Sequence, residues 1–137
     1  MNKMQTKVIE NKDILPEGKT ATLAKFSYGV SKLIQGKTFG VKTQGEKHVP
    51  DFNTGSMMIY YLVYGIYECE HLGIQRPKSS IGILDTFEEQ NRYNIVFSLD
   101  KQTGDWLYKE ISEYNNLKDT KDREEVEKKL QPSSTEN

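Results

Sequence analysis

The most apolar stretch of this 137-residue chain, Met57 to Tyr67, contains four tyrosines and no charged residue. Its eleven residues would be about 17 Å long as a helix and about 36 Å long as a strand. A membrane-crossing helix needs about 20 apolar residues, so the stretch is too short to cross as a helix. Its tyrosines and β-branched residues favour a strand, and alternation would place apolar residues on both faces. The pattern therefore predicts a central strand covered on both sides.

Other segments of strand length are separated by turn-forming residues. Residues 21–43 predict a β-hairpin that turns at Gln35-Gly36, although apolar residues at every third or fourth position leave a helix open. A short strand is expected around Lys7 to Glu10, and another over residues 80–85. Residues 44–56 have the composition of a loop.

The segment from Arg92 to Ile111 gives the strongest hairpin pattern, because two apolar runs flank a loop that contains Gly104. The alternative is a helix beginning at Asp105, in which Leu107 and Ile111 would share one stripe with Tyr114. The hairpin interpretation makes the chain predominantly β.

These patterns divide the chain into an N-terminal arm (1–20), a strand-rich core domain (21–116) and a charged C-terminal helix with a tail (117–137). A chain of this length predicts one folded domain. The predicted fold class is α+β and strand-rich, either an antiparallel sheet or a small, partly open β-barrel, with a C-terminal helix. Residues 118–137 offer only Val126 and Leu130 for burial, so we expect the domain to fold without them.

Charge is distributed unevenly along the chain, although the formal net charge is only −1. Residues 1–50 carry nine lysines and four acidic residues, a net of +5, whereas residues 81–137 carry eight basic and thirteen acidic residues, a net of −5. A basic first part is typical of proteins that contact nucleic acid, and it also fits a surface that packs against its own acidic part.

The chain lacks the residues that several kinds of functional site require. The tripeptide Gly-Lys-Thr occurs twice, but a phosphate-binding loop also needs an earlier glycine, and those positions hold Asp13 and Ser31. A structural zinc site needs four ligands, whereas the chain has one cysteine, Cys69, and two histidines. No paired carboxylates have the pattern of a catalytic site. The sequence therefore predicts a protein that is not an enzyme and uses no metal or cofactor.

Tyrosines interleaved with basic residues suggest a surface for single-stranded nucleic acid. Sheet proteins of this kind stack bases on exposed aromatic rings and hold the phosphates with lysine or arginine. RNA is favoured over DNA as the partner. The candidate stacking residues are Tyr60, Tyr64 and Tyr108, and the candidate phosphate contacts are Lys25, Lys32, Lys37, Lys42, Arg76 and Lys78.

The tetrapeptide Lys37 to Gly40, KTFG, resembles a motif in small uncharacterised accessory proteins of Gram-positive conjugative plasmids and transposons. The resemblance covers these four residues and implies a regulatory role on a mobile genetic element. Two functions follow as alternatives. The first is a non-enzymatic regulatory protein that binds RNA, and the second is a protein–protein adaptor or inhibitor, in one version a homodimer.

The cellular location follows from the first residues and the cysteine content. The first 20 residues mix charges throughout and lack the apolar core of a signal peptide. A single cysteine excludes an internal disulfide, which fits a reducing compartment. We therefore expect a cytoplasmic protein that does not enter a membrane.

Overall fold

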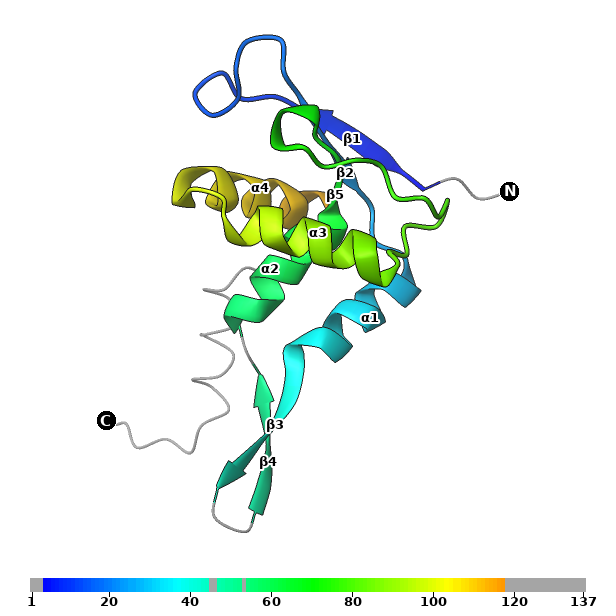
Figure 1. Cartoon of the computed structure of the whole chain (residues 1–137), viewed down its shortest axis with the longest axis vertical. Helices are drawn as coiled ribbons and strands as arrows, with labels where there is room; N and C mark the ends of the chain where they lie inside the picture. The colour runs from blue at the N-terminus through cyan, green and yellow to red at the C-terminus, as the bar shows by residue number, and fades with distance from the viewer. Residues whose placement is uncertain (1–3, 45–46, 53, 118–137) are drawn as a thin grey trace.

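The computed structural model describes residues 4–44, 47–52 and 54–117. Among them it contains four α-helices, a three-stranded sheet and a separate two-stranded hairpin (Figure 1). The elements in chain order are β1 (Thr6–Ile9), β2 (Ala21–Ala24), α1 (Tyr28–Thr38), β3 (Phe39–Gln44), β4 (Lys47–Phe52), α2 (Thr54–Gly65), β5 (Ile66–Glu68), the 3₁₀ turn η1 (Glu70–Leu72), α3 (Thr86–Phe97) and α4 (Lys101–Tyr114).

The predicted strand-rich fold is wrong, because most of the predicted strands are helices. The Met57–Tyr67 stretch forms most of α2 and enters the short strand β5. Residues 61–66 are buried consecutively, which a helix permits when other elements surround it on all sides. The weak strand preference of tyrosine and β-branched residues is overridden by this packing.

The two predicted hairpins are also corrected. Residues 21–43 contain β2, α1 and most of β3, so the helical alternative describes their middle part. Residues 92–97 belong to α3 and residues 101–111 to α4. The helical alternative is again the right one, although α4 begins at Lys101 rather than at Asp105. The predicted strand over residues 80–85 and the predicted loop over residues 44–56 are not found either; the latter contains β4 and the start of α2.

Capping residues explain why α3 and α4 begin where they do. Asp85 accepts a hydrogen bond from the backbone N–H of Glu88 at 2.7 Å, and the Glu88 side chain accepts one from the backbone N–H of Asp85 at 3.0 Å. This reciprocal pair is a capping box. Asp100 caps α4 by accepting from the backbone N–H of Thr103 at 3.0 Å. Each cap gives a hydrogen-bond partner to a backbone N–H group in the first turn, where the helix itself supplies none.

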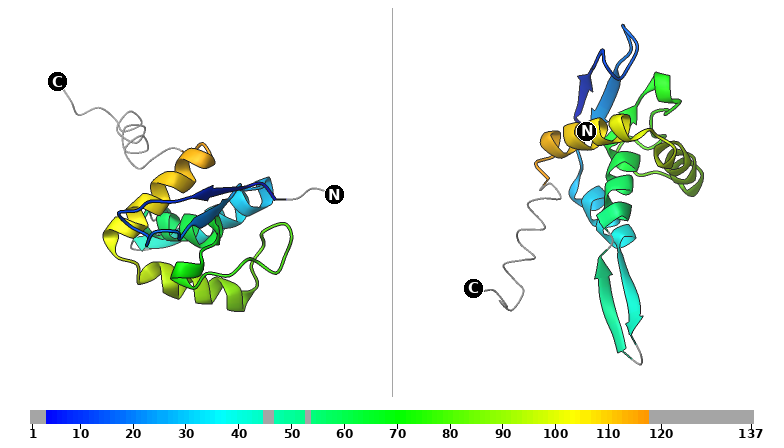
Figure 2. Two further views of the ribbon diagram at one scale, coloured as in Figure 1. Left: turned by 90° about the horizontal axis from the view of Figure 1, so that it is seen from above. Right: turned by 90° about the vertical axis from the view of Figure 1, so that its left-hand side faces the viewer.

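The three-stranded sheet has the order β1-β2-β5, and both pairings are antiparallel. The strand predicted around Lys7 to Glu10 is confirmed as β1, with Val8 opposite Thr22 of β2. The sheet lies at one end of the molecule, and the hairpin of β3 and β4 lies at the other end (Figure 1). A second view shows that this hairpin extends clear of the helices (Figure 2, right).

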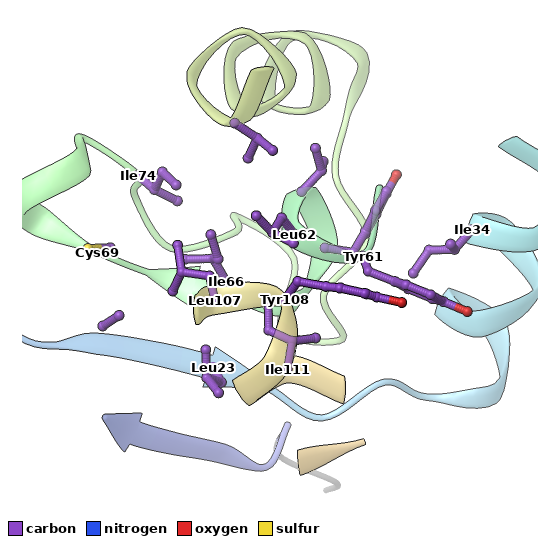
Figure 3. Close-up of a cluster of buried hydrophobic side chains, with 14 of the residues drawn as sticks. Leu23, Ile34, Tyr61, Leu62, Ile66, Cys69, Ile74, Leu107, Tyr108 and Ile111 are labelled. Atoms are coloured by element: carbon purple, nitrogen blue, oxygen red, sulfur yellow. The ribbon is translucent and has the colours of Figure 1, made fainter. Parts of the chain in front are cut away.

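The core forms where α2 and α4 pack against β2 and β5, as Figure 3 shows. Leu23, Ile66, Leu107 and Ile111 meet there and are fully buried. The two helices approach so closely at Gly65 that a Cβ atom there would lie 2.7 Å from Cγ2 of Ile111. Only glycine fits this contact without displacing its neighbour.

A buried arginine joins α3 to the end of α2. The Arg92 guanidinium donates to four backbone carbonyls: Val63 at 2.8 Å, Tyr67 at 2.9 Å, Gln75 at 2.5 Å, and Ile66. Burial lowers the pKa of Arg92 to about 10, so the side chain remains charged at neutral pH. The charge is stabilised by the four carbonyl dipoles and by the nearby Glu88 carboxylate, and the hydrogen bonds tie together segments that are distant in sequence.

The described residues include no helix with both the length and the apolar content needed to span a bilayer. Of the predicted C-terminal helix and tail (117–137), only Leu117 is described. The rest of that prediction lies outside the described residues.

Candidate protein-docking surface

The tyrosines predicted to stack on bases occupy different environments. Tyr64 and Tyr108 are buried, with exposed fractions of 4% and 6%. Their ring faces are in contact with the core, so neither is presented to a base in this structure. Tyr60 is half-buried and remains at the surface. Burial of Tyr64 and Tyr108 follows from the helical form of residues 54–65 and 101–114, which turns both side chains inward.

Three of the predicted phosphate contacts form ion pairs within the protein. Lys37 Nζ lies 3.0 Å from a Glu89 oxygen, Arg76 Nε lies 3.0 Å from a Glu68 oxygen, and Lys78 Nζ lies 3.7 Å from an Asp85 oxygen. Each of these pairs compensates a positive charge locally. The ion pairs therefore weaken the field that a phosphate backbone would meet.

The remaining lysines lie apart from these pairs. Lys25 donates to the backbone carbonyl of Tyr114 at 2.5 Å, and its ammonium lies 4.8 Å from the centre of the Tyr114 ring. Lys32 lies over the Tyr28 ring at 5.2 Å. Lys42 belongs to β3, and its side chain lies outside the described part of the structure. The predicted residues thus come from several separate places on the molecule.

Three of them, Tyr60, Tyr64 and Lys37, meet around Glu89. Glu89 of α3 accepts a hydrogen bond from the Tyr64 hydroxyl at 2.5 Å through one carboxylate oxygen and pairs with Lys37 through the other. Burial, and then the bond to Glu89, raise the pKa of Tyr64. The bond to Glu89 also raises the pKa of Lys37. Tyr60 lies close enough for both charges to affect its pKa, which burial raises.

The bonds of this cluster join α1, α2 and α3 to one another. Because its pKa is raised, Tyr64 keeps its proton at neutral pH, and the charge of the Glu89 carboxylate is compensated by Lys37. Within the described ranges, no three His, Cys, Asp or Glu side chains come together in a way that could hold a metal ion.

An exposed set of aromatic rings begins beside this cluster. The ring of Tyr60 on α2 lies 5.7 Å from that of Tyr93 on α3, which stacks on Phe97 with ring centres 6.0 Å apart. We call these three residues the aromatic row. Phe97 is 68% exposed although it is a large apolar side chain. The sequence reasoning missed Tyr93 and Phe97 because it placed them in a strand, where side chains four residues apart on one face lie about 13 Å apart. In a helix the same spacing makes the two rings neighbours.

A small apolar cavity lies on the other side of the end of α3. It has a volume of 160 Å³, and the first turn of α4 forms its mouth, where Lys101 and Asp105 are paired at 2.7 Å. The Tyr108 hydroxyl has no hydrogen-bond partner among the described residues. The apolar and aromatic lining consists of Met58, Ile59, Leu62, Val96, Leu99 and Tyr108.

The aromatic row and the cavity use neighbouring residues. Ile59 lines the cavity and Tyr60 begins the row, whereas Val96 lines the cavity and Phe97 ends the row. The end of α3 therefore separates two apolar features of one surface region.

Comparison of the chain with family models, with curated proteins and with solved structures found no match. The function of this protein is therefore inferred from the geometry of its own side chains.

Proposed function

We propose that this protein is a small, non-enzymatic protein–protein adaptor that binds its partner on the aromatic row. The observation that carries the proposal is the 68% exposure of Phe97, which stacks on Tyr93 at a ring-centre distance of 6.0 Å. Exposed aromatic side chains are enriched at protein interfaces, and a few such residues supply most of the binding free energy.

Contact between neighbouring rings of the aromatic row favours partner binding for a second reason. Each ring in the row is restrained by its neighbour, so little rotamer freedom is left to lose when a partner covers it. Burying the exposed part of a phenylalanine contributes up to about 1.5–3 kcal/mol. The row offers this gain without a charged side chain that would have to lose its water.

The alternative, binding of RNA, has less support. Lys37, Arg76 and Lys78 are paired with carboxylates, and two of the three candidate stacking tyrosines are buried. We further propose that the adaptor works in the cytoplasm, where the single buried thiol of Cys69 stays reduced. An accessory role on a mobile genetic element is the setting that the KTFG resemblance suggests for it.

The test compares two alanine variants of α3. Phe97→Ala removes the end of the row, and Phe87→Ala removes an equally large side chain on the same helix that is 77% exposed and lies outside the row. A partner is first isolated from the native host with the wild-type protein, with and without nuclease treatment, and its affinity is then measured by calorimetry with purified components.

We expect Phe97→Ala to weaken partner binding about tenfold or more, the effect of losing one interface anchor. Phe87→Ala should leave the affinity unchanged. Equal affinities of Phe97→Ala and wild type would overturn the proposal. A partner lost on nuclease treatment, together with oligonucleotide binding that falls steeply with salt, would favour the RNA alternative instead.

A further inference from the structure

We propose that the cavity between α2, α3 and α4 is the receptor for one aromatic side chain of the partner, next to a basic residue of that partner. This inference rests on the proposed function, because it identifies the chemistry of the segment that an adaptor of this kind would bind. It concerns a feature separate from the aromatic row.

The size of the cavity selects the first part of the ligand. An enclosed apolar cavity of about 150 Å³ takes up benzene, and this cavity, which opens to the surface, has a similar volume of 160 Å³. Met58, Ile59 and Leu62 line one side from α2. A phenyl ring is close in size to this space, and the mostly apolar lining favours a ring over a charged group.

The charged residues at the mouth of the cavity indicate the second part of the ligand, a basic residue. Of its three charged residues, Asp100 and Asp105 are acidic and Lys101 is basic, so the mouth carries a net charge of −1. Lys101 is bonded to Asp105, which leaves the charge of Asp100 without a compensating cation among the described residues. A lysine or arginine beside the inserted ring would supply that cation at the surface.

Position along α3 connects the cavity to the aromatic row. Val96 lines the cavity, and the next residue, Phe97, ends the row. One partner segment lying over the end of α3 could therefore cover the row and insert a side chain into the cavity. The basic residue follows from the charge of the mouth and not from the row.

Gly104 allows the cavity to be blocked without disturbing the core. This glycine lines the cavity at the end of the first turn of α4, and a Cβ atom there would meet no heavy atom within 4 Å. Gly104→Leu has room to fill the space near the mouth. Both leucine and alanine favour a helix more than glycine does, so neither Gly104→Leu nor the control Gly104→Ala should lower the melting temperature.

The experiment uses the full chain and small probes of known chemistry. Toluene is titrated while the methyl resonances of Met58, Ile59 and Leu62 are followed by NMR. We expect saturable shifts at these methyls, at least about tenfold weaker toluene binding in Gly104→Leu, and little change in Gly104→Ala. The absence of shifts at these methyls, or unchanged binding in Gly104→Leu, would overturn the proposal.

A pair of dipeptides tests the basic residue. N-acetyl-Phe-Lys-amide should bind about two- to fivefold more tightly than N-acetyl-Phe-Glu-amide, the range expected of one exposed ion pair. The preference should shrink in Asp100→Asn and at high salt. Equal binding of both dipeptides to the wild-type protein would overturn the part of the proposal that concerns charge.

Failure of this inference can be separated from failure of the proposed function. Phe97→Ala should leave toluene binding unchanged, because Phe97 is not among the cavity-lining residues. If the adaptor binds its partner through both features, Gly104→Leu should also weaken partner binding about tenfold. Partner binding that depends on Phe97 but not on Gly104 would overturn the cavity as the anchor site and leave the aromatic row in place.

Discussion

Two sets of three aromatic rings lie side by side in this protein, and they differ in what surrounds them. Phe26, Tyr61 and Tyr108 form a set with ring centres 5.9 Å and 6.2 Å apart, whose two tyrosines are buried in the core (Figure 3). The aromatic row has similar spacings of 5.7 Å and 6.0 Å but ends in the exposed Phe97. The ring spacings are therefore similar, although the Tyr60 ring is tilted by 47° to that of Tyr93 whereas both pairs of the buried set are stacked. The surroundings decide which set holds the fold and which is open to a partner.

The two sets begin at neighbouring residues of α2. Tyr60 belongs to the exposed set and Tyr61 to the buried set. Successive residues of an α-helix differ by about 100° in direction, so one tyrosine faces α3 near the surface while the next faces α4 in the core. The pair shows that a tyrosine's role in this molecule depends on its angular position on α2 rather than on its local sequence.

The largest expected effect on the free energy of unfolding comes from removing the Arg92 side chain. Arg92→Leu takes away the donor of four backbone carbonyls at the junction of α2 and α3. Leaving several buried acceptors unsatisfied should reduce the free energy of unfolding by about 4 kcal/mol or more. Urea denaturation measures the loss, with the exposed neighbour Asn91→Leu as a control that should change little. A cooperative transition within about 1 kcal/mol of wild type would contradict this account.

The next prediction tests the comparison directly with the two adjacent tyrosines. Tyr61→Ala opens a cavity in the core and should cost about 3–5 kcal/mol, as large-to-small aromatic changes in a core do. Tyr60→Ala removes a half-buried ring and should cost about 1 kcal/mol. Equal losses in thermal or urea unfolding would mean that the exposed set also serves stability.

A smaller effect is expected from alkaline pH through Tyr64, which lies on α2 between the two sets. Burial raises its pKa in the folded protein, so the folded state keeps the proton that the unfolded chain loses above about pH 10. The stability linked to Tyr64 is therefore fully present below about pH 10 and falls above it, by about 1 kcal/mol per pH unit. In Tyr64→Phe this part of the loss should be absent, which urea denaturation at a series of pH values can measure. Parallel curves for the two proteins would show that Tyr64 does not contribute.

The smallest effect on stability is expected at the end of the aromatic row. Phe97→Ala should change the free energy of unfolding by no more than about 0.5 kcal/mol, because the side chain is 68% exposed. The same variant should weaken partner binding about tenfold, so stability and binding separate at this residue. A loss of stability comparable to that of Tyr61→Ala would instead assign Phe97 to the core.

Part of the candidate surface was within reach of the sequence. The capping pattern from Asp85 to Glu88 marks the start of α3, and a helix from that point places Tyr93 and Phe97 four residues apart on one face. Tyr60 was selected from the sequence and does lie at the surface beside Tyr93. Its assignment rested on a strand, however, and the same reasoning selected Tyr64, which is buried.

The sequence by itself determined the limits within which this chain folds. The Met57–Tyr67 stretch is too short for a membrane-crossing helix, and one cysteine allows no internal disulfide. The short strand expected around Lys7 to Glu10 is observed as β1. The shared stripe of Leu107, Ile111 and Tyr114 indicated a helix as the alternative to a hairpin, and α4 is that helix. These features depend on residue type and local spacing, which a sequence states directly.

Only the tertiary structure decided between helix and strand for residues 57–67, because a stretch that is apolar on every side has no periodicity to distinguish them. It also decided the burial of Arg92, whose carbonyl partners lie 17 to 29 residues away in the chain. The same packing buried Tyr61 and left Tyr60 at the surface. Burial is a property of what other segments cover, and that information arises only when elements distant in sequence come together.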